Sequence, residues 1–334
     1  MQRLLIAVLL LALPAIAYGE PEASWQGKSV PHWIVQLSAD EVQTRWYATY
    51  ALGQIGAATG ETADLVPAIG PLTEILADPD RVQYEYVRGG AAWALGQIGP
   101  MADDQLATRN VVEQLIEALG SQLVSVRRNA PAALGNFGDA ATPAVDRLVQ
   151  LLGDDDVVVR VNSAVALWKI QQYPQSVTIL AQLARGGDPT GAFAAVEALG
   201  RIGTDSDAAL PVLVQALGHR DADVRRAAAR ALGRFGAAAV PALREPLFGP
   251  DAQSRRSATE ALGWIGPRAI AALLVVLKNE DPAVRRVAAR ALGRMGGEAK
   301  RAESALVEAV GDNDRQVQEA AASALKKIRA TDGP

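Results

Sequence analysis

Apolar residues recur at helical spacing through most of the chain, and one stretch shows the pattern with particular clarity. Residues 209–218 carry apolar side chains at that spacing and end at Gly218, a common helix stop. Asp221 then stands where it can cap a second helix over 224–235. At 100° per residue, the apolar side chains of this second segment share one face: Val224, Ala228, Ala231, Leu232 and Phe235. The pattern predicts two antiparallel helices joined by a short turn.

This unit ends in the sequence motif Ala-Leu-Gly-x-[Ile/Phe/Met]-Gly, a phrase that recurs along the chain. Counting two degenerate copies, its leucines are Leu52, Leu95, Leu134, Leu167, Leu199, Leu232, Leu262, Leu292 and Leu325. The first two intervals are 43 and 39 residues, and the others are 30–33. Neither helix of such a unit can bury its apolar face without the next unit, so the nine copies predict a solenoid. No segment shows the alternation of a strand, and the predicted fold class is all-α.

Three copies of a longer pattern resemble the HEAT-like repeat family, in the short form named after phycobilin lyases. The pattern is Asp-x-x-x-Arg-x-x-Ala-x-x-Ala-Leu-Gly-x-[Ile/Phe/Met]-Gly, and its copies begin at Asp221, Asp251 and Asp281. The resemblance covers residues 30–330 and implies a right-handed superhelical α-solenoid of about nine helical hairpins. The opening Gln-Gly-Lys-Ser-Val-Pro-His-Trp of residues 26–33 also looks like that of exported bacterial HEAT-repeat proteins of unassigned role.

The resemblance further implies that the aspartate and arginine of each repeat form a ladder along the stack. The ladder arginines would be Arg45, Arg88, Arg127, Arg160, Arg225, Arg255 and Arg285. A planar guanidinium suits bonds to loop carbonyls and carboxylates, so we expect a structural role for this set. Ala192 replaces the arginine in the fifth unit and Gln318 replaces it in the ninth.

The N-terminus differs in composition from the repeats. Arg3 precedes an apolar run, Leu4–Ala17, that ends in the small-x-small sequence Ala15-Ile16-Ala17. The run has 14 residues, fewer than the ~20 needed to cross a bilayer. It predicts a secretory signal over residues 1–17 and an exported protein, periplasmic or secreted. An uncleaved anchor is the alternative. We expect residues 18–29 to be a flexible tether, 30–330 the solenoid and 331–334 a tail.

The amino-acid composition limits the chemistry that this protein could perform. The net charge of −4 gives no reason to expect nucleic acid as a partner, and the absence of cysteine excludes thiol chemistry. The two histidines, His32 and His219, are not followed by glutamate, so the paired His-Glu metal motifs of the HEAT-like hydroxylases are missing. We therefore expect no cofactor, no metal and no catalysis. Phycobilin-lyase-type activity is the enzymatic alternative, against which the export signal argues.

Side chains opposite the core of each second helix are the candidate contact residues. They are aromatic toward the N-terminus and basic toward the C-terminus: Trp46, Tyr50, Trp93, Arg226, Arg230, Arg234, Trp264, Arg286, Arg290 and Arg294. Tyr84 and Tyr86, in an expected loop, join the aromatic group. Trp, Tyr and Arg are the residues enriched at interface hot spots. Mutual packing of the aromatic side chains and a solvated arginine face are the alternatives.

These observations predict a monomeric, non-catalytic protein-binding scaffold of the cell envelope that uses the concave face of its solenoid. The alternative function is binding of a polyanion, or of an acidic ligand, through the basic C-terminal groove.

Overall fold

The computed structural model describes residues 24–59, 63–78, 85–100, 105–203, 206 and 208–330. The predicted signal segment 1–17, Tyr84 and the tail 331–334 lie outside these residues. The chain divides into two compact units, Met1–Ser176 and Val177–Pro334.

In the first unit, four pairs of α-helices follow one another. They are α2 (Val30–Gln36) with α3 (Val42–Thr59), α4 (Val66–Ala77) with α5 (Glu85–Ile98), α6 (Gln105–Ala118) with α7 (Val124–Asn136), and α8 (Val145–Gln150) with α9 (Val157–Gln171). Short 3₁₀ turns precede or extend the first helices at η1 (Ala63–Leu65), η3 (Gly138–Ala144) and η4 (Leu151–Gly153).

The second unit continues the series from α10 (Gln175–Arg185), which begins at the boundary, and α11 (Pro189–Ile202). The further pairs are α12 (Ala209–Ala216) with α13 (Ala222–Phe235), α14 (Arg244–Phe248) with α15 (Ala252–Ile265), α16 (Ile270–Val276) with α17 (Pro282–Arg294), and α18 (Glu303–Val310) with α19 (Arg315–Arg329). Within the described residues of this unit, the 3₁₀ turns between the helices are η6 (Gly236–Ala239), η7 (Pro241–Leu243), η8 (Gly266–Ala269) and η9 (Gly296–Ala302).

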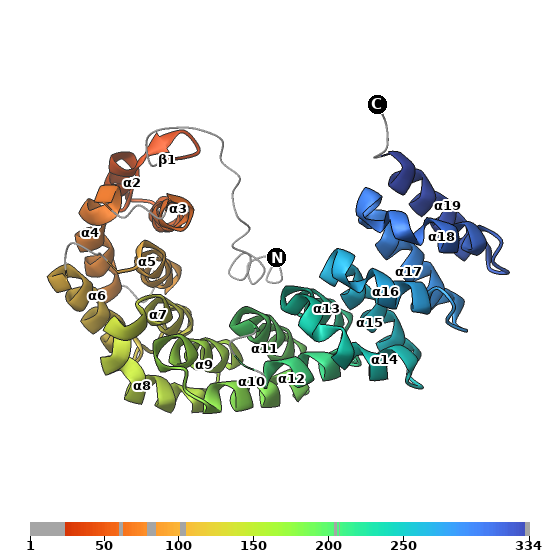
Figure 1. Ribbon diagram of the computed structural model, residues 1–334. Coiled ribbons are helices and arrows are strands. Elements are labelled where there is room, and N and C mark those ends of the chain that lie inside the picture. The colour runs from red at the N-terminus through yellow and green to blue at the C-terminus, as the bar shows by residue number, and fades with distance from the viewer. Residues whose placement is uncertain are drawn as a thin grey trace. The chain divides into compact units, whose positions relative to one another are not determined.

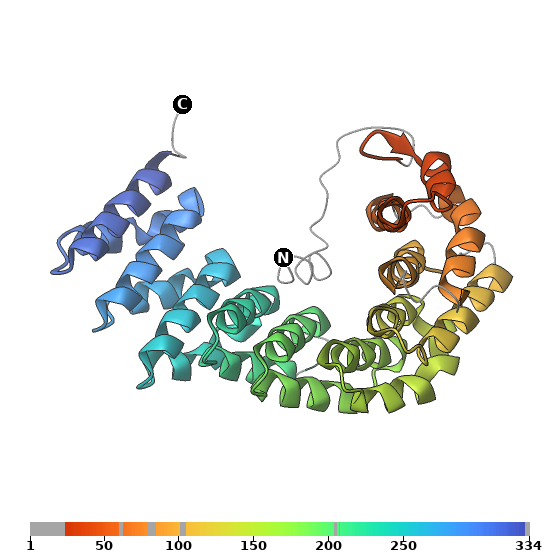
Figure 2. The same ribbon diagram turned by 180° about the vertical axis from the view of Figure 1, so that it is seen from behind.

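Nine helical pairs are thus present in the described residues, and the predicted all-α solenoid is confirmed. In each unit the first helices form one layer and the second helices form another (Figures 1 and 2). We call the side formed by α3, α5, α7 and α9 in the first unit, and by α11, α13, α15, α17 and α19 in the second, the second-helix face.

Local sequence signals set the helix ends. The Asp221 carboxylate accepts hydrogen bonds from the backbone N–H groups of Asp223 (2.8 Å) and Val224 (3.3 Å) at the start of α13. The helix ends at Gly236, whose φ of +58° suits glycine best. The predicted segment 224–235 therefore matches α13 to within two residues.

The two glycines of the repeated motif have different structural roles. The second ends the helix, whereas the first lies where successive second helices are in contact. A Cβ added to Gly96 of α5 would stand 2.5 Å from Ala133 Cα of α7. The same addition to Gly293 of α17 would stand 2.8 Å from Ala324 Cα of α19. Alanines and glycines at these points let the backbones approach closely, and leucines such as Leu95 and Leu134 fill the core beside them.

The N-terminal residues correct one prediction. Within the expected tether 18–29, residues 24–29 form an antiparallel hairpin of β1 (Ser24–Trp25) and β2 (Lys28–Ser29). Gln26 and Gly27 have φ of +51° and +71°, as a tight two-residue hairpin turn requires. Strand alternation was not visible in so short a segment, and the contacts of Trp25 with α2 and α3 hold the hairpin in place.

The loop expected around Tyr84 and Tyr86 ends earlier than the sequence suggests, because Glu85 and Tyr86 already belong to α5. The long first interval is partly taken up by α3, which extends to Thr59 beyond the second glycine of its phrase, Gly56.

By length and composition alone, one helical stretch among the described residues could cross a membrane, Ala252–Val276, with a mean hydropathy of 1.3. In the structure it consists of α15, η8 and α16, with a break at Gly266, whose φ is +79°. Its leucines Leu262 and Leu273 are fully buried in the repeat core. The stretch therefore serves as parts of two successive repeats.

Candidate functional site

Aromatic side chains gather on the second-helix face of the first unit. Tyr50 stacks between Trp46 of its own helix α3 and Trp93 of α5, with ring centroids 5.9 and 5.5 Å apart and interplanar angles of 15° and 14°. We call these three residues the aromatic stack. All three are half-buried, and Trp93 lies over Gly53, where a Cβ would stand 2.2 Å from its ring. The rings therefore use much of their faces on one another and on the next repeat.

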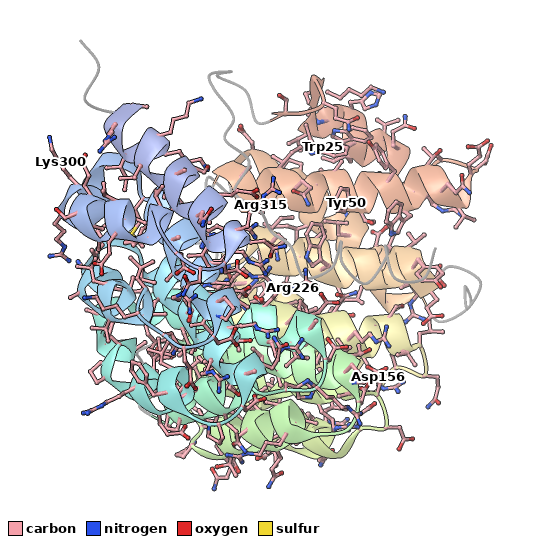
Figure 3. The ribbon with its side chains drawn as sticks, turned by 90° about the vertical axis from the view of Figure 1, so that its right-hand side faces the viewer. Trp25, Tyr50, Asp156, Arg226, Lys300 and Arg315 are labelled. Atoms are coloured by element: carbon pink, nitrogen blue, oxygen red, sulfur yellow. The ribbon has the colours of Figure 1, made fainter. Side chains whose placement is uncertain are left out.

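Two aromatic residues that the sequence did not single out extend this cluster. Trp25 of the hairpin meets Tyr50 edge-on at 5.6 Å and Tyr47 at 5.1 Å (Figure 3). Tyr47 also donates a hydrogen bond from its hydroxyl to Gln26 at 3.0 Å. Tyr86 lies at the start of α5 and is 67% exposed, with no ring contact to the stack among the described residues. The structure thus joins Trp46, Tyr50 and Trp93 and leaves Tyr86 apart.

Arg128 shows how the fold neutralises an arginine on this face. Its guanidinium donates two hydrogen bonds, of 2.9 and 2.6 Å, to the carboxylate of Asp156 at the start of α9. Burial works to raise the pKa of Asp156, but the bonds from Arg128 and from backbone N–H groups outweigh it, and the pKa lies below its usual value.

The three arginines of α13 have partners as well. Arg226 forms an ion pair with Asp223 one turn earlier. Arg230 lies 3.0 Å and Arg234 3.7 Å from the Glu197 carboxylate of α11. Glu197 was not among the predicted site residues, although it occupies the position in its own repeat that Arg230 occupies in α13. Each arginine of this triplet therefore has an ion-pair partner within the second unit, and Arg230 and Arg234 share one carboxylate.

The corresponding arginines of α17 differ. Within the described part of the chain, no carboxylate lies within ion-pair distance of Arg286, Arg290 or Arg294, and the Nε of Arg286 is buried without a hydrogen-bond partner. These side chains line a groove of about 490 Å³, which we call the α17–α19 groove. Its walls are Arg286, Arg290, Gly293 and Arg294 of α17, and Gln316, Glu319, Ala320, Ser323, Ala324 and Lys327 of α19.

Trp264, on α15 between the two arginine-bearing helices, is 57% exposed. Its Cβ packs against Gly233 of α13, since a Cβ added to that glycine would lie 2.7 Å from the Cβ of Trp264. The rest of the ring has no aromatic partner among the described residues. An exposed tryptophan beside unpaired arginines is a composition typical of contact surfaces.

The ladder arginines bind the turn that precedes their own helix. The guanidinium donates to the carbonyl oxygen six residues earlier, as from Arg225 to His219 (2.6 Å), Arg255 to Gly249 (2.8 Å) and Arg285 to Asn279 (2.7 Å). Arg45, Arg127 and Arg160 repeat this bond. Arg88 instead donates to Leu76 O at 3.0 Å. In the ninth repeat Gln318 takes the same place, with its side-chain amide 2.6 Å from Asp312 O.

Some of these arginines also link successive repeats. Arg285 donates to both carboxylate oxygens of Asp312 at 2.7 Å, and Arg127 donates to Asp154 at 2.9 Å. The hydrogen bond from Arg285 lowers the pKa of Asp312, and the same bond raises the pKa of Arg285. The ladder arginines therefore use their hydrogen bonds to hold the repeats together, in contrast to the arginines of the α17–α19 groove.

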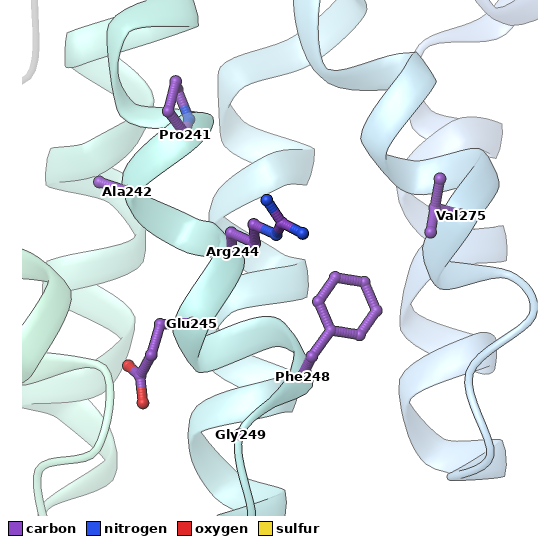
Figure 4. A pocket seen from close by; sticks show the side chains of 7 residues that line it. All are labelled: Pro241, Ala242, Arg244, Glu245, Phe248, Gly249 and Val275. Carbon is purple, nitrogen blue, oxygen red and sulfur yellow. The ribbon is translucent and has the colours of Figure 1, made fainter.

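A second hollow, of about 980 Å³, lies between α14 and α16 in the first-helix layer of the second unit (Figure 4). Phe248 and Val275, 54% and 57% exposed, face it together with Arg244 and Glu245. It is an apolar surface with few polar groups and no cluster suited to acid–base chemistry.

Among the described residues, no group of three His, Cys, Asp or Glu side chains is placed to hold a metal ion. His32 packs edge-on against Trp33 at 5.1 Å, and Nδ1 of His219 accepts a hydrogen bond from the Asp221 N–H at 3.0 Å. Both histidines therefore have contacts that suit a structural role.

Comparison with known families and structures agrees with the fold. Residues 112–199, 179–248 and 240–326 match the model of the HEAT repeats, and residues 87–121 match that of the PBS lyase HEAT-like repeat. A crystal structure of an engineered protein is 25% identical over 90% of this chain and 88% of its own, with a TM-score of 0.42. No curated protein matches the chain.

Proposed function

The chain belongs to the HEAT-repeat family, a fold that typically serves as a non-catalytic scaffold for protein interactions, and we propose that it is a protein-binding scaffold of the cell envelope. The second-helix face supplies the contact surface. One observation carries the proposal. On α15 and α17 of the described fold, Trp264 is 57% exposed and has no aromatic partner, and three arginines have no ion pair.

The aromatic stack supports the proposal less directly. Its three rings contribute to packing between the first two repeats, and their partly exposed edges remain available to a partner. We therefore assign the main contact to the second unit and a secondary one to the first.

Binding is tested by capture from an envelope extract with the purified mature chain. We expect W264A, which removes the exposed ring on the second-helix face, to lose a partner that the wild type retains. The matched control is F248A, which removes a similarly exposed ring from the first-helix layer and should retain the partner. Loss of the partner in both variants, or capture of none by the wild type, would refute the assignment.

The cellular location is part of the proposal and rests on residues 1–17. The charged start, the short apolar run and the Ala-x-Ala end are what a signal peptidase recognises. Cell fractionation and N-terminal sequencing should find a chain that starts near Tyr18 outside the cytoplasm. A full-length chain in the cytosol would refute export, and a full-length chain in the membrane would indicate an uncleaved anchor.

A further inference from the structure

Two helices of the second unit carry the same sequence of arginines in different surroundings. Arg226, Arg230 and Arg234 of α13 recur as Arg286, Arg290 and Arg294 of α17, and the last two of each set lie in the same Ala-Ala-Arg-Ala-Leu-Gly-Arg segment. The first set is paired with Asp223 and Glu197, and the second set has no ion pair in the described part of the unit. Like charges at this spacing repel each other weakly, and an anion bound from outside would relieve that repulsion.

The surroundings of the α17 arginines form a site rather than an open helix face. Lys327 of α19 adds a fourth positive charge across the groove, and Ser323 adds a hydroxyl beside it. Glu319, the one acidic residue of the lining, is engaged by Arg315 at 2.9 Å. The buried Nε of Arg286 is an unsatisfied donor at one end of the groove. An anion bound here would meet several donors that the protein itself does not use.

The spacing of the arginines indicates the form of that anion. Residues four apart on a helix are separated by about 6 Å along its axis, since the rise is about 1.5 Å per residue. In an extended peptide, side chains two residues apart point to the same side and lie about 6.6 Å apart. A carboxylate at every second position would therefore meet one arginine after another.

We propose that the α17–α19 groove binds an extended acidic segment of a partner protein, with Asp or Glu at alternate positions opposite Arg286, Arg290 and Arg294. This proposal rests on the scaffold function and names the chemistry of its partner. Guanidinium groups form paired, charge-assisted hydrogen bonds with carboxylates, which adds geometric selectivity to the attraction. Lys327 holds the other side of the segment as a point charge.

A discrete acidic peptide fits the groove better than a continuous polyanion such as a nucleic acid. Glu319 stands in the groove wall, and Glu260 of α15 lies on the same face one repeat earlier. A polymer with a charge on every unit would have to pass these carboxylates, whereas a short segment with neutral residues between its acids can avoid them. The whole chain has a net charge of −4, which further disfavours long polyanions.

The probe is a fluorescein-labelled synthetic peptide with three glutamates separated by single alanines, and binding is measured by fluorescence anisotropy with the mature chain. Its matched control replaces the glutamates with glutamines. We expect saturable binding of the acidic peptide that weakens as salt is raised, and none of the neutral one. Arg290→Gln should weaken binding at least tenfold, whereas Arg230→Gln, which changes the same position of the ion-paired triplet of α13, should change it less than twofold. Thermal melts by circular dichroism establish that both variants fold.

Equal weakening by the two substitutions, or no binding by the wild type, would overturn the proposal. A peptide with three adjacent glutamates that binds as tightly would overturn the alternate spacing. If inorganic polyphosphate or single-stranded DNA bound more tightly than the peptide, and Arg290→Gln abolished that binding, the ligand of the groove would be a polyanion and the peptide proposal would be wrong. Capture of a partner that depends on Trp264 but not on Arg290 would refute the peptide site and leave the scaffold function standing.

Discussion

The close approach of α5 and α7 at Gly96 provides a quantitative test of how the repeats pack. In Gly96→Ala the added Cβ would stand 2.5 Å from Ala133 Cα and 2.6 Å from Ala133 Cβ. Carbon atoms in favourable contact are ~3.5–4.0 Å apart, so the two helices must separate by about 1 Å. Because the obstacle is backbone, no side chain can turn aside to relieve it.

Overpacking of this kind costs typically ~1–3 kcal/mol, and a backbone contact belongs at the upper end of that range. Because alanine has the higher helix propensity, the replacement of glycine by alanine inside a helix stabilises it by about 1 kcal/mol. We therefore expect a net loss of about 2 kcal/mol. For a unit of this size, that corresponds to a fall in melting temperature of about 4–8 °C.

Gly153→Ala is the matched control, because an added Cβ there would have no atom within 4 Å and φ is not positive. It should raise stability by about 0.4–1 kcal/mol through the unfolded chain. Thermal melts at 222 nm, with unfolding midpoints in urea as a second measure, compare both variants with the wild type. A Gly96→Ala protein that melts at or above the wild-type temperature would show that the helices are not in contact at this point.

Three further predictions concern the ladder and the N-terminal cluster. Because the bond from Arg285 lowers the pKa of Asp312 from 3.8, the ionised carboxylate stabilises the fold above that pH, and the contribution disappears as the pH falls below it. Asp312→Asn should be less stable than the wild type at neutral pH, and acid-unfolding curves of the two should converge as the pH falls through the lowered pKa of Asp312; curves that stay parallel would exclude the linkage. Gln318→Ala removes the hydrogen bond to the Asp312 carbonyl, so its free energy of unfolding in urea should fall by about 1 kcal/mol. Gln318→Arg should keep the wild-type stability, and equal losses in the two variants would count against that bond. Trp25→Ala should lose about 2 kcal/mol in thermal melts because its ring is half-buried, and Val35→Ala, at a 70% exposed position, less than ~0.5 kcal/mol; similar effects would mean that the hairpin does not dock.

The architecture could be predicted because its signals are local and repeated. The apolar spacing, the aspartate before each second helix and the glycine after it act within a few residues. Asp221 caps α13 and Gly236 ends it, as the sequence predicts. The hairpin at residues 24–29 was missed because two-residue strands show no periodicity, and its position depends on ring contacts with Tyr47 and Tyr50, which lie about twenty residues away in the chain.

The candidate site could be predicted only in part. The angular position of each arginine on its helix follows from the sequence, since the helix period is fixed. Whether Arg230 and Arg290 are paired depends on the preceding repeat, although the two arginines have the same local sequence. Glu197, 33 residues before Arg230, reaches it across the contact of α11 with α13, whereas no carboxylate in the described fold is within ion-pair distance of Arg290. The sequence by itself determined the repeats, their helices and their caps, and only the tertiary structure decided which charges are paired, because an ion pair forms over a few ångströms between side chains that the stacking of the repeats brings together.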